Sequence, residues 1–341
     1  MRKLASIQTI REIVPIQGAD RIELARINGW QSVVPKGVHT VGERVVYCEI
    51  DCWIPHSLAP QLSKGGEPKV YDGITGNRLR TVTLKGVLSQ GLVLPATVLF
   101  DRHVSISCLK DDEDVSSILG IVKYDPPIPA HLQGQIKSTF PSHTPKTDQQ
   151  RVQTLGKLIE EYHENELTFV IEEKLEGSSM SICINKGEID VCSRTMSLKD
   201  DGQNTFWKVT KQYNLIEKIQ SLKRNLSFQF ELCGEGIQKN IYKIKGHDCF
   251  LYDIYDIDRR CYLLPDERES IANVLQIKPV PIIGYITFSS CNVHDIDKIL
   301  SIAEGKSVLN TSHEREGIVF KCMTENISFK AISNKYLLQE S

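Results

Sequence analysis

The feature of this sequence that most constrains its fold is a proline-rich stretch without periodicity, Tyr124 to Lys146, near the middle of the chain. Prolines fix the backbone and remove amide donors, so this stretch is expected to be an extended connector rather than a helix. The chain has 341 residues, which is more than a single hydrophobic core usually holds. We therefore expect two domains, residues 1–120 and 148–341, joined by a linker at 121–147.

The first region consists of short apolar runs separated by turns that contain glycine or proline. Residues 21–27 and 78–84 alternate polar and apolar side chains, which is the pattern of a half-buried strand. Three further runs, at residues 32–34, 44–50 and 91–95, complete the set. Several short strands at this spacing favour a small β-barrel of the OB type.

The second region mixes strands with helices. A helix is expected to begin near Thr147 or Asp148, and its apolar stripe would be Val152, Leu155, Leu158, Ile159 and Tyr162. Further helices are predicted over residues 204–220, 267–275 and 295–303. Strands are predicted over residues 168–174, 180–184, 189–192, 228–233, 249–257, 317–322 and 327–332. The predicted fold class of the whole chain is α+β.

Composition and charge exclude several classes of protein. No apolar run approaches the roughly 20 residues that a membrane-spanning helix needs, and the first residues lack the apolar segment of a secretory signal. The 10 cysteines form no C-x-x-C pair, so we expect reduced thiols in an intracellular protein rather than disulfides or a zinc site. With 41 basic and 43 acidic residues the net charge is −2, so a nucleic-acid partner would need a local basic groove.

One short segment gives the first sign of chemistry. Lys174 ends an apolar strand, and Gly177 then allows the chain to turn tightly. An amine held at a strand end can act as a nucleophile if its surroundings lower its pKa from about 10.4. A surface lysine before a turn is the alternative interpretation, because so short a pattern recurs by chance.

Other polar residues follow Lys174 in a fixed order along the predicted strands. They are Arg194 after one strand, Glu231 on the polar face of an apolar strand, the aromatic segment 250–256, Glu316 at a strand start, and Lys330 near the end of the last strand. Each of them alone has an ordinary structural explanation, such as a surface ion pair or core packing. Together, their order and spacing resemble the motifs of the covalent nucleotidyltransferases, the family of polynucleotide ligases and capping enzymes.

The resemblance covers roughly residues 168–335. Residues 174–177, Lys-Leu-Glu-Gly, resemble the K-x-D/E-G motif that contains the nucleophile. The Gly-x-Gly-Ile-Gln-Lys-Asn run at residues 234–240 is more similar to RNA ligases than to DNA ligases. A strand-rich domain placed before the nucleotidyltransferase domain resembles the Deinococcus-type RNA ligase group. No second OB domain is expected after Ser341, unlike in DNA ligases and capping enzymes.

The resemblance implies an ATP-dependent RNA ligase that seals 3′-hydroxyl and 5′-phosphate RNA ends, such as those at a nick, in three phosphoryl transfers. Lys174 would attack the α-phosphorus of ATP, which forms lysyl-AMP and releases pyrophosphate. The AMP would pass to an RNA 5′-phosphate, and a 3′-hydroxyl would then displace it. Each step depends mainly on positioning and on neutralising phosphate charge. We expect a monomer that acts inside the cell, in the cytoplasm or nucleus, without a membrane partner.

Within this resemblance, three carboxylates are candidates for holding Mg²⁺ or Mn²⁺, directly or through water: Glu176, Glu231 and Glu316. Lys330 would bind the α-phosphate oxygens. Its ammonium charge and the cation would both depress the pKa of Lys174 by like-charge repulsion.

Other residues are expected to hold the nucleotide. Tyr252 or Phe250 would stack on one face of the adenine, and Val319 on the other. Strand alternation places Glu172 on the Lys174 face, so Glu173 is the candidate to accept a hydrogen bond from the adenine amino group. Two further contacts are implied, from Ser179 to the ribose and from Arg194 to the ribose or the RNA phosphate.

Two positions depart from the family pattern. Glu176 stands where many relatives have aspartate, which moves the carboxylate by one methylene. Ile332 occupies the position of the second lysine in a K-x-K motif that would begin at Lys330. Lys335 is the nearby residue that could replace it.

The N-terminal domain is expected to hold the RNA through its phosphates. Arg78, Arg80 and Lys85 are the candidates, with both arginines on one face of their strand. A solvated strand face is the alternative interpretation for each of them. Trp30 and Trp53 are expected in the core rather than as platforms for base stacking. Further candidates for RNA contact are Lys239, Lys243 and Lys245.

Two alternatives remain at this point. A DNA ligase or a GTP-dependent capping enzyme would use the same lysine chemistry, but the run at residues 234–240 argues against both. A non-catalytic RNA-binding protein built on the OB domain would form no adenylate. A vestigial second domain would have no reason to keep the set Lys174, Glu231, Glu316 and Lys330.

Overall fold

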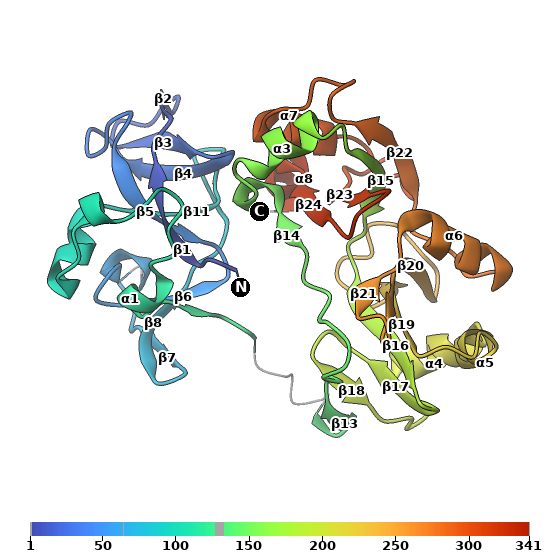
Figure 1. Cartoon of the computed structure of the whole chain (residues 1–341). Helices are drawn as coiled ribbons and strands as arrows, with labels where there is room; N and C mark the ends of the chain where they lie inside the picture. The colour runs from blue at the N-terminus through green and yellow to red at the C-terminus, as the bar shows by residue number, and fades with distance from the viewer. Residues whose placement is uncertain (1, 64, 127–132, 341) are drawn as a thin grey trace. The chain divides into compact units, whose positions relative to one another are not determined.

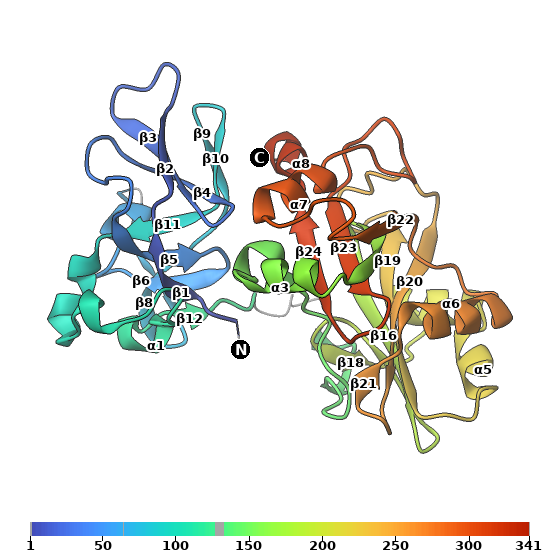
Figure 2. The same cartoon turned by 45° about the horizontal axis from the view of Figure 1, so that its top comes forward.

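The computed structural model describes residues 2–63, 65–126 and 133–340. The chain divides into two compact units, one of Met1–Pro127 with Leu337–Ser341 and one of Ile128–Tyr336 (Figures 1 and 2). Part of the expected linker, residues 127–132, lies outside the described residues. Other parts of it form short strands, which are β12 (Val122–Lys123) in the N-terminal unit and β13 (Ile136–Thr139) in the second unit.

The N-terminal unit consists mainly of antiparallel strands. They are β1 (Ala5–Thr9), β2 (Glu12–Pro15), β3 (Ile22–Ile27), β4 (Trp30–Pro35), β5 (Arg44–Glu49), β6 (Cys52–Pro55), β7 (Lys69–Tyr71), β8 (Ile74–Arg78), β9 (Val82–Leu84), β10 (Val87–Ser89), β11 (Gly91–Leu94) and β12 (Val122–Lys123). They pair in the orders β1-β5-β11, β2-β3-β4, β12-β6-β8-β7 and β10-β9. Short helical turns follow at η1 (Pro60–Ser63), η2 (Ala96–Arg102), η3 (Ile106–Cys108) and α1 (Ser116–Leu119).

The alternating run at residues 78–84 is not one strand, so this prediction was wrong. β8 ends at Arg78, and β9 begins at Val82 and pairs only with β10 among the described strands. Leu79 between them is buried, and its amide donates to the carbonyl of Cys52 at 2.9 Å. The alternation therefore spans two strands that belong to different sheets.

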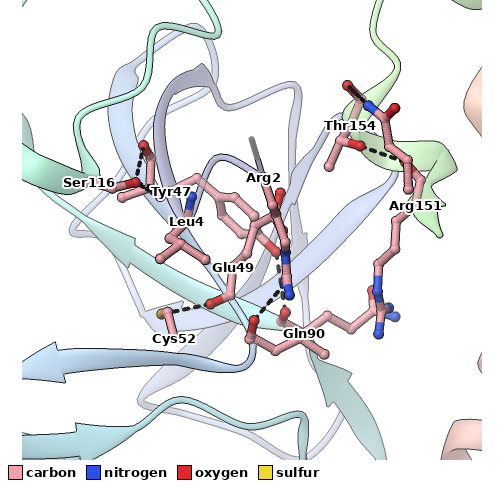
Figure 3. Close-up of polar contacts among 12 residues, drawn as sticks. Arg2, Leu4, Tyr47, Glu49, Cys52, Gln90, Ser116, Arg151 and Thr154 are labelled. Carbon is pink, nitrogen blue, oxygen red and sulfur yellow. Dashed lines mark hydrogen bonds and ion pairs between the residues drawn. The ribbon is translucent and has the colours of Figure 1, made fainter. Parts of the chain in front are cut away.

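Side-chain hydrogen bonds hold the first residues of the chain to the N-terminal unit. The amide of Leu4 donates to Ser116 Oγ at 3.1 Å, and Arg2 Nε donates to Glu49 Oε2 at 2.7 Å (Figure 3). Trp30 and Trp53 are both 3% exposed, which confirms that they are core residues.

The second unit contains two sheets. The seven-stranded sheet has the order β13 (Ile136–Thr139), β18 (Met196–Leu198), β17 (Glu188–Cys192), β16 (Ser178–Asn185), β19 (Leu226–Gly234), β20 (His247–Asp256) and β21 (Cys261–Tyr262). The five-stranded sheet has the order β14 (Gln150–Arg151), β24 (Ser328–Ile332), β23 (Gly317–Cys322), β15 (Thr168–Lys174) and β22 (Ile282–Thr287). The helical segments are η4 (Val152–Thr154), α3 (Leu158–Glu164), α4 (Thr205–Gln212), α5 (Leu215–Gln220), α6 (Pro265–Val274) and α7 (Ile296–Ala303). The helix α8 (Asn334–Glu340) begins in this unit, and its residues from Leu337 on belong to the first unit.

Each sheet packs one face against its own hydrophobic core. On the five-stranded sheet, Phe169 and Phe320 point into one core, so strand alternation places Lys174 on the opposite face. On the seven-stranded sheet, Phe230 points into the other core, so Glu231 lies on the opposite face. The polar faces that remain carry the charged residues of the candidate site.

The predicted helix near residue 148 begins ten residues later than expected. Residues 150–151 form β14 instead, which pairs parallel to β24, and α3 begins only at Leu158. Gly156 separates the two with a φ of 55°, which a side chain would disfavour. The apolar stripe is nevertheless buried, except for Leu158, which is 38% exposed.

Other differences from the predicted elements are local. The predicted helix 204–220 breaks at Asn214, whose φ is 49°, into α4 and α5. β22 and α8 were not predicted. The α+β class is confirmed, and all ten cysteines, each in the described part of the chain, are free thiols. Among the described residues, no helix combines the length and the apolar character that crossing a bilayer requires.

Candidate active site

The candidate site is a group of charged side chains that comes from both sheets of the second unit. Lys174 Nζ lies 2.6 Å from Glu316 Oε1, because the end of β15 pairs with the start of β23. Lys330 lies on the adjacent strand β24, and Glu231 comes from β19 of the other sheet. The structure thus brings together four residues that the sequence places far apart.

Burial and the neighbouring charges shift the pKa values of two residues in this group. Burial raises the pKa of Glu231 to about 8, which Glu316 reinforces and Lys174 opposes. Burial lowers the pKa of Lys330 to about 7, and the charges of Lys174 and Arg151 lower it further. Both groups change charge near neutral pH, so a bound cation or phosphate would determine their charge.

The turn that follows Lys174 fits tightly against β19. A Cβ atom at Gly177 would lie 2.5 Å from the carbonyl oxygen of Leu232 and 2.9 Å from Glu231 Cγ, so a side chain cannot fit there. The amide of Gly177 also donates to the Glu231 carboxylate. The amide of Glu176 donates to the hydroxyl of Tyr242 at 2.5 Å. Glycine is therefore required where the chain passes from one sheet to the other.

A second charged cluster lies between the same sheets. Arg268 of α6 forms a buried ion pair with Glu172, which lies on the Lys174 face of β15 as predicted. Lys321 of β23 lies 2.6 Å from Asp253 and 3.5 Å from Glu172. Arg268 and Lys321 also both donate to the carbonyl of Tyr252. These four charges join the sheets through direct contacts.

Glu173 points to the other side of its strand from Lys174. Its Oε2 accepts the amide of Val308 at 2.7 Å, whereas its Oε1 is buried and accepts no hydrogen bond from the described residues. Burial raises the pKa of Glu173, and hydrogen bonds from Ser307 and Val308 partly offset this shift. One buried acceptor oxygen is thus available on the face of β15 opposite Lys174.

The two aromatic candidates, Phe250 and Tyr252, lie two residues apart on β20. The hydroxyl of Tyr252 is 3.3 Å from Ser179 Oγ, which is 2.7 Å from Thr147 Oγ1. Burial raises the pKa of Tyr252. Phe250 is 4% exposed, and Lys278 Nζ lies 5.1 Å from its ring centroid. Both aromatic side chains are therefore held in place.

Val319 lies beside Lys330, and among the described residues Arg194 is linked to it only through Asp148. Arg194 Nη2 is 2.5 Å from Asp148 Oδ1, and the charge of Asp148 raises the pKa of Lys330. Val319 is directly opposite Lys330 in the pairing of β23 with β24. A cavity of about 260 Å³ opens nearby between the two sheets, lined among others by Tyr252 and Asp148.

Two of the carboxylates predicted to hold a metal ion, Glu231 and Glu316, interact electrostatically, but they do not form a complete set of ligands. Glu316 raises the pKa of Glu231, so a divalent cation beside them would relieve a repulsion that already exists. In the described part of the chain, no three His, Cys, Asp or Glu side chains converge as a ligand cluster. A cation here would therefore keep several waters or phosphate oxygens as ligands, which is typical of Mg²⁺.

Some predicted residues lie away from this group. Lys335 does not approach it, since its Nζ lies 3.6 Å from Glu304 Oε2 and its side chain is 66% exposed. Ile332, at the position of the missing second lysine, is buried. Three lysines on the segment that follows β19 are exposed, namely Lys239, Lys243 and Lys245.

The basic residues of the N-terminal unit do not form the predicted row. Arg78 forms an ion pair with Asp51 at 2.5 Å, and its guanidinium lies 4.8 Å from the ring centroid of Tyr124. Arg80 is exposed and lies outside the strands, and Lys85 is exposed in the β9–β10 turn. The two arginines are therefore not on one strand face, because the strand ends at Arg78.

Several residues near the site were not predicted. Arg151 lies beside Lys330 because the two-residue strand β14 pairs with β24, and so short a strand has no periodic signal. Asp148 was considered only as a possible helix start. Tyr242 follows the most informative motif of the chain, but nothing in its neighbours indicates that it turns back to residue 176.

Comparisons with known proteins agree with this geometry. A family model described as RNA ligase matches residues 167–336, and an OB-fold domain model matches residues 4–96. No curated protein sequence matches the chain significantly.

Solved structures similar to the whole chain include several of Naegleria gruberi RNA ligase. A glutamate-to-alanine variant with AMP and Mn has 42% identity and a TM-score of 0.86, and the match covers 100% of this chain and 99% of that one. A lysine-to-alanine variant with ATP and Mn has 42% identity, a TM-score of 0.84 and 99% coverage of both chains. The form with PPi has 43% identity, a TM-score of 0.83 and 99% coverage of both. This chain therefore belongs to the RNA ligase family, with an OB-fold domain in front of its ligase domain.

Proposed function

We propose that this protein is an ATP-dependent RNA ligase that seals 3′-hydroxyl and 5′-phosphate RNA ends, such as those at a nick, through lysyl-AMP and RNA-adenylate. The observation that carries the proposal is the convergence of Lys174, Glu316, Lys330 and Glu231 from two sheets. The similar Naegleria gruberi enzyme has been crystallised with ATP, AMP, PPi and Mn. ATP and Mg²⁺ or Mn²⁺ are therefore the proposed cofactors.

The variants of that enzyme support the choice of residues. Among the residues replaced in its crystal structures are five with the chain order lysine, aspartate, glutamate, glutamate and lysine. They follow one another at the same intervals along the chain as Lys174, Glu176, Glu231, Glu316 and Lys330 do here. The one change of residue type is the glutamate at position 176.

In the first step, Lys174 Nζ would form a bond to the α-phosphorus of ATP, and the bond from that phosphorus to the pyrophosphate oxygen would break. Glu316 Oε1 is the closest acceptor for the proton that the amine must lose. Lys330 would bind the oxygens of the α-phosphate. The negative charge of the bound phosphate would raise the lowered pKa of Lys330, so that its amine carries a proton when ATP is present. The divalent cation would supply further charge neutralisation on the phosphates.

The nucleotide would be held by residues around this amine. Glu173 Oε1, a buried acceptor, suits the adenine amino group. Val319 and either Tyr252 or Phe250 would enclose the base, with Ser179 on the ribose. Arg194 would contact the ribose or the RNA phosphate.

The N-terminal OB-fold domain would hold the RNA. Arg80 and Lys85 are exposed and suited to phosphate contact, and Arg78 would contribute if RNA displaces its ion pair with Asp51. Lys239, Lys243 and Lys245 are additional exposed candidates on the ligase domain. We expect the protein to act as a monomer inside the cell, in keeping with its free thiols.

Mass spectrometry of the purified protein, before and after incubation with ATP and Mn²⁺, tests the proposal. We expect an added AMP on the peptide that contains Lys174. Labelling by GTP instead of ATP would indicate a capping enzyme, and preference for a nick with a DNA 3′ end would indicate a DNA ligase. The absence of any covalent adduct would favour a non-catalytic RNA-binding protein.

Deletion of residues 1–120 tests the role of the N-terminal domain. We expect the truncated protein to form lysyl-AMP at close to the normal rate and to seal RNA poorly. Sealing at the full rate would remove the RNA-binding role of that domain.

A further inference from the structure

The loop that follows the nucleophile connects the two sheets of the ligase domain. β15 of the five-stranded sheet ends at Lys174, and β16 of the seven-stranded sheet begins at Ser178. Backbone groups in such a loop have no strand partner, so they need other hydrogen-bond partners. The amide of Glu176 finds one in the hydroxyl of Tyr242, at 2.5 Å.

Two side chains of the segment that follows β19 make hydrogen bonds to this loop. Gln238 Nε2 donates to the carbonyl of Gly177 at 3.3 Å, but Gln238 is exposed to water. Tyr242 is only 6% exposed, so water competes least for its bond to the loop. The segment is itself fixed, because Asn310 Nδ2 donates to the carbonyl of Ile241 at 2.5 Å.

The environment of Tyr242 indicates what its hydroxyl can do. Burial raises the pKa of Tyr242 far above its usual value, and the charges of Glu316 and Glu173 act in the same direction. The hydroxyl therefore suits a neutral hydrogen-bonding role toward the loop.

We propose that Tyr242 is a positioning residue for lysine adenylylation. By accepting the amide of Glu176, its hydroxyl fixes the loop so that Lys174 stays beside Glu316. This inference rests on the proposed function, since it concerns the step in which lysine attacks ATP. A reacting group displaced by about 1 Å loses about 100-fold in rate, so a modest loosening of this loop is enough to matter.

Replacing Tyr242→Phe tests the proposal, because it removes the hydroxyl and keeps the ring. In single-turnover experiments at saturating ATP, we expect lysyl-AMP formation to slow by about 10-fold or more. The ATP concentration for half-maximal rate should change by less than about 3-fold, because the ring and the nucleotide contacts remain. The pH dependence should keep its wild-type shape, because no titrating group is lost.

A matched control removes a tyrosine hydroxyl elsewhere in the same domain. Tyr213 donates to Asp248 Oδ1 at 3.0 Å, and no contact in the described structure joins it to the loop. Tyr213→Phe should form lysyl-AMP at the normal rate. An equal loss in both variants would overturn the proposal, because it would reflect a general loosening of the domain.

Sealing of RNA that already carries a 5′-adenylate gives a second measurement, since the lysine is not the nucleophile in that step. Tyr242→Phe should retain this sealing within about 3-fold of the wild type, and an equal loss in both steps would contradict a positioning role.

If Tyr242→Phe fails to fold, Asn310→Ala should slow lysyl-AMP formation selectively, because it frees the segment that carries Tyr242.

Lysyl-AMP formation by the wild type and by Tyr242→Phe separates the proposed function from the role of Tyr242. A wild-type protein that forms no lysyl-AMP would overturn the proposed function and this inference with it. A wild-type protein that forms lysyl-AMP, with Tyr242→Phe equally fast, would overturn only the role of Tyr242.

Discussion

Two charged clusters of equal composition lie between the same two sheets. Each has two cations and two carboxylates: Lys174, Lys330, Glu231 and Glu316 in the site cluster, and Arg268, Lys321, Glu172 and Asp253 in the structural cluster. In the structural cluster every charge touches an opposite charge. In the site cluster, the one direct ion pair among the four is between Lys174 and Glu316.

The incomplete pairing is accompanied by shifted pKa values for two residues of the site cluster. Glu231 and Lys330 are partly buried, and neither forms a direct ion pair within the cluster. Desolvation moves their pKa values to about 8 and about 7. Buried charges are costly unless they are paired. An incompletely paired group therefore marks a place where charged ligands complete the pairing, whereas the structural cluster has no such requirement.

The largest effect is expected from Lys174→Ala. Because this amine forms the covalent bond, the variant should form no protein-AMP adduct detectable by mass spectrometry. Its free energy of unfolding should stay within about 1 kcal/mol of the wild type, since the side chain is partly exposed. A purified variant that still becomes labelled would show that another residue is the nucleophile.

Glu316→Ala and Lys330→Ala should each slow adenylylation by about 100-fold or more, because each removes a charge that acts on the reacting phosphate or amine. Single-turnover labelling with radioactive ATP measures this effect. The matched control is Lys335→Ala, whose side chain is exposed beside Glu304 and should leave the rate unchanged. Normal rates in the first two variants would contradict the assignments of metal and phosphate contacts.

Arg268→Met should affect stability. It leaves the carboxylates of Glu172 and Asp253 buried with one cation instead of two, so we expect a loss of about 3–5 kcal/mol in the free energy of unfolding. Urea denaturation checks this. Arg259→Met is the control, because its ion pair with Glu267 is on the surface and should contribute little. Equal losses in both variants would mean that burial of the structural cluster is unimportant.

The smallest effect concerns pH. In the folded protein Glu231 keeps its proton up to about pH 8, whereas in the unfolded chain it loses the proton near its ordinary value of 4.5. The contribution of Glu231 to stability should therefore fall as pH rises through this window, by at most about 1.4 kcal/mol per pH unit. Glu231→Gln should become more stable relative to the wild type over the same range, measured by urea denaturation without metal. A difference that stays constant with pH would contradict the raised pKa.

The sequence predicted the strands that carry the site because their alternating pattern and motif order are local. Strand alternation was enough to place Glu172 on the Lys174 face of β15, and motif order was enough to group Lys174 with Glu316. It could not indicate that Glu172 meets Arg268, since that ion pair depends on how α6 packs against the other sheet.

The unpredicted features share a physical cause. β14 is two residues long, and its partner β24 lies far along the chain, so no local periodicity in the sequence indicates β14. Tyr242 reaches the loop at residue 176 only because the chain reverses after β19. The helix prediction near residue 148 failed where this parallel pairing and the left-handed backbone of Gly156 outweigh the apolar spacing.

The segment between β13 and β14, residues 140–149, is attached at its two ends to different sheets. Along its length, Gln229 donates to the carbonyl of Pro145 at 3.4 Å, and Ser328 donates to Gln149 at 2.8 Å. The segment thus acts as a tether across the gap in which ATP would react. A wide parting of the sheets would therefore have to stretch the residues between these two contacts or break one of the contacts.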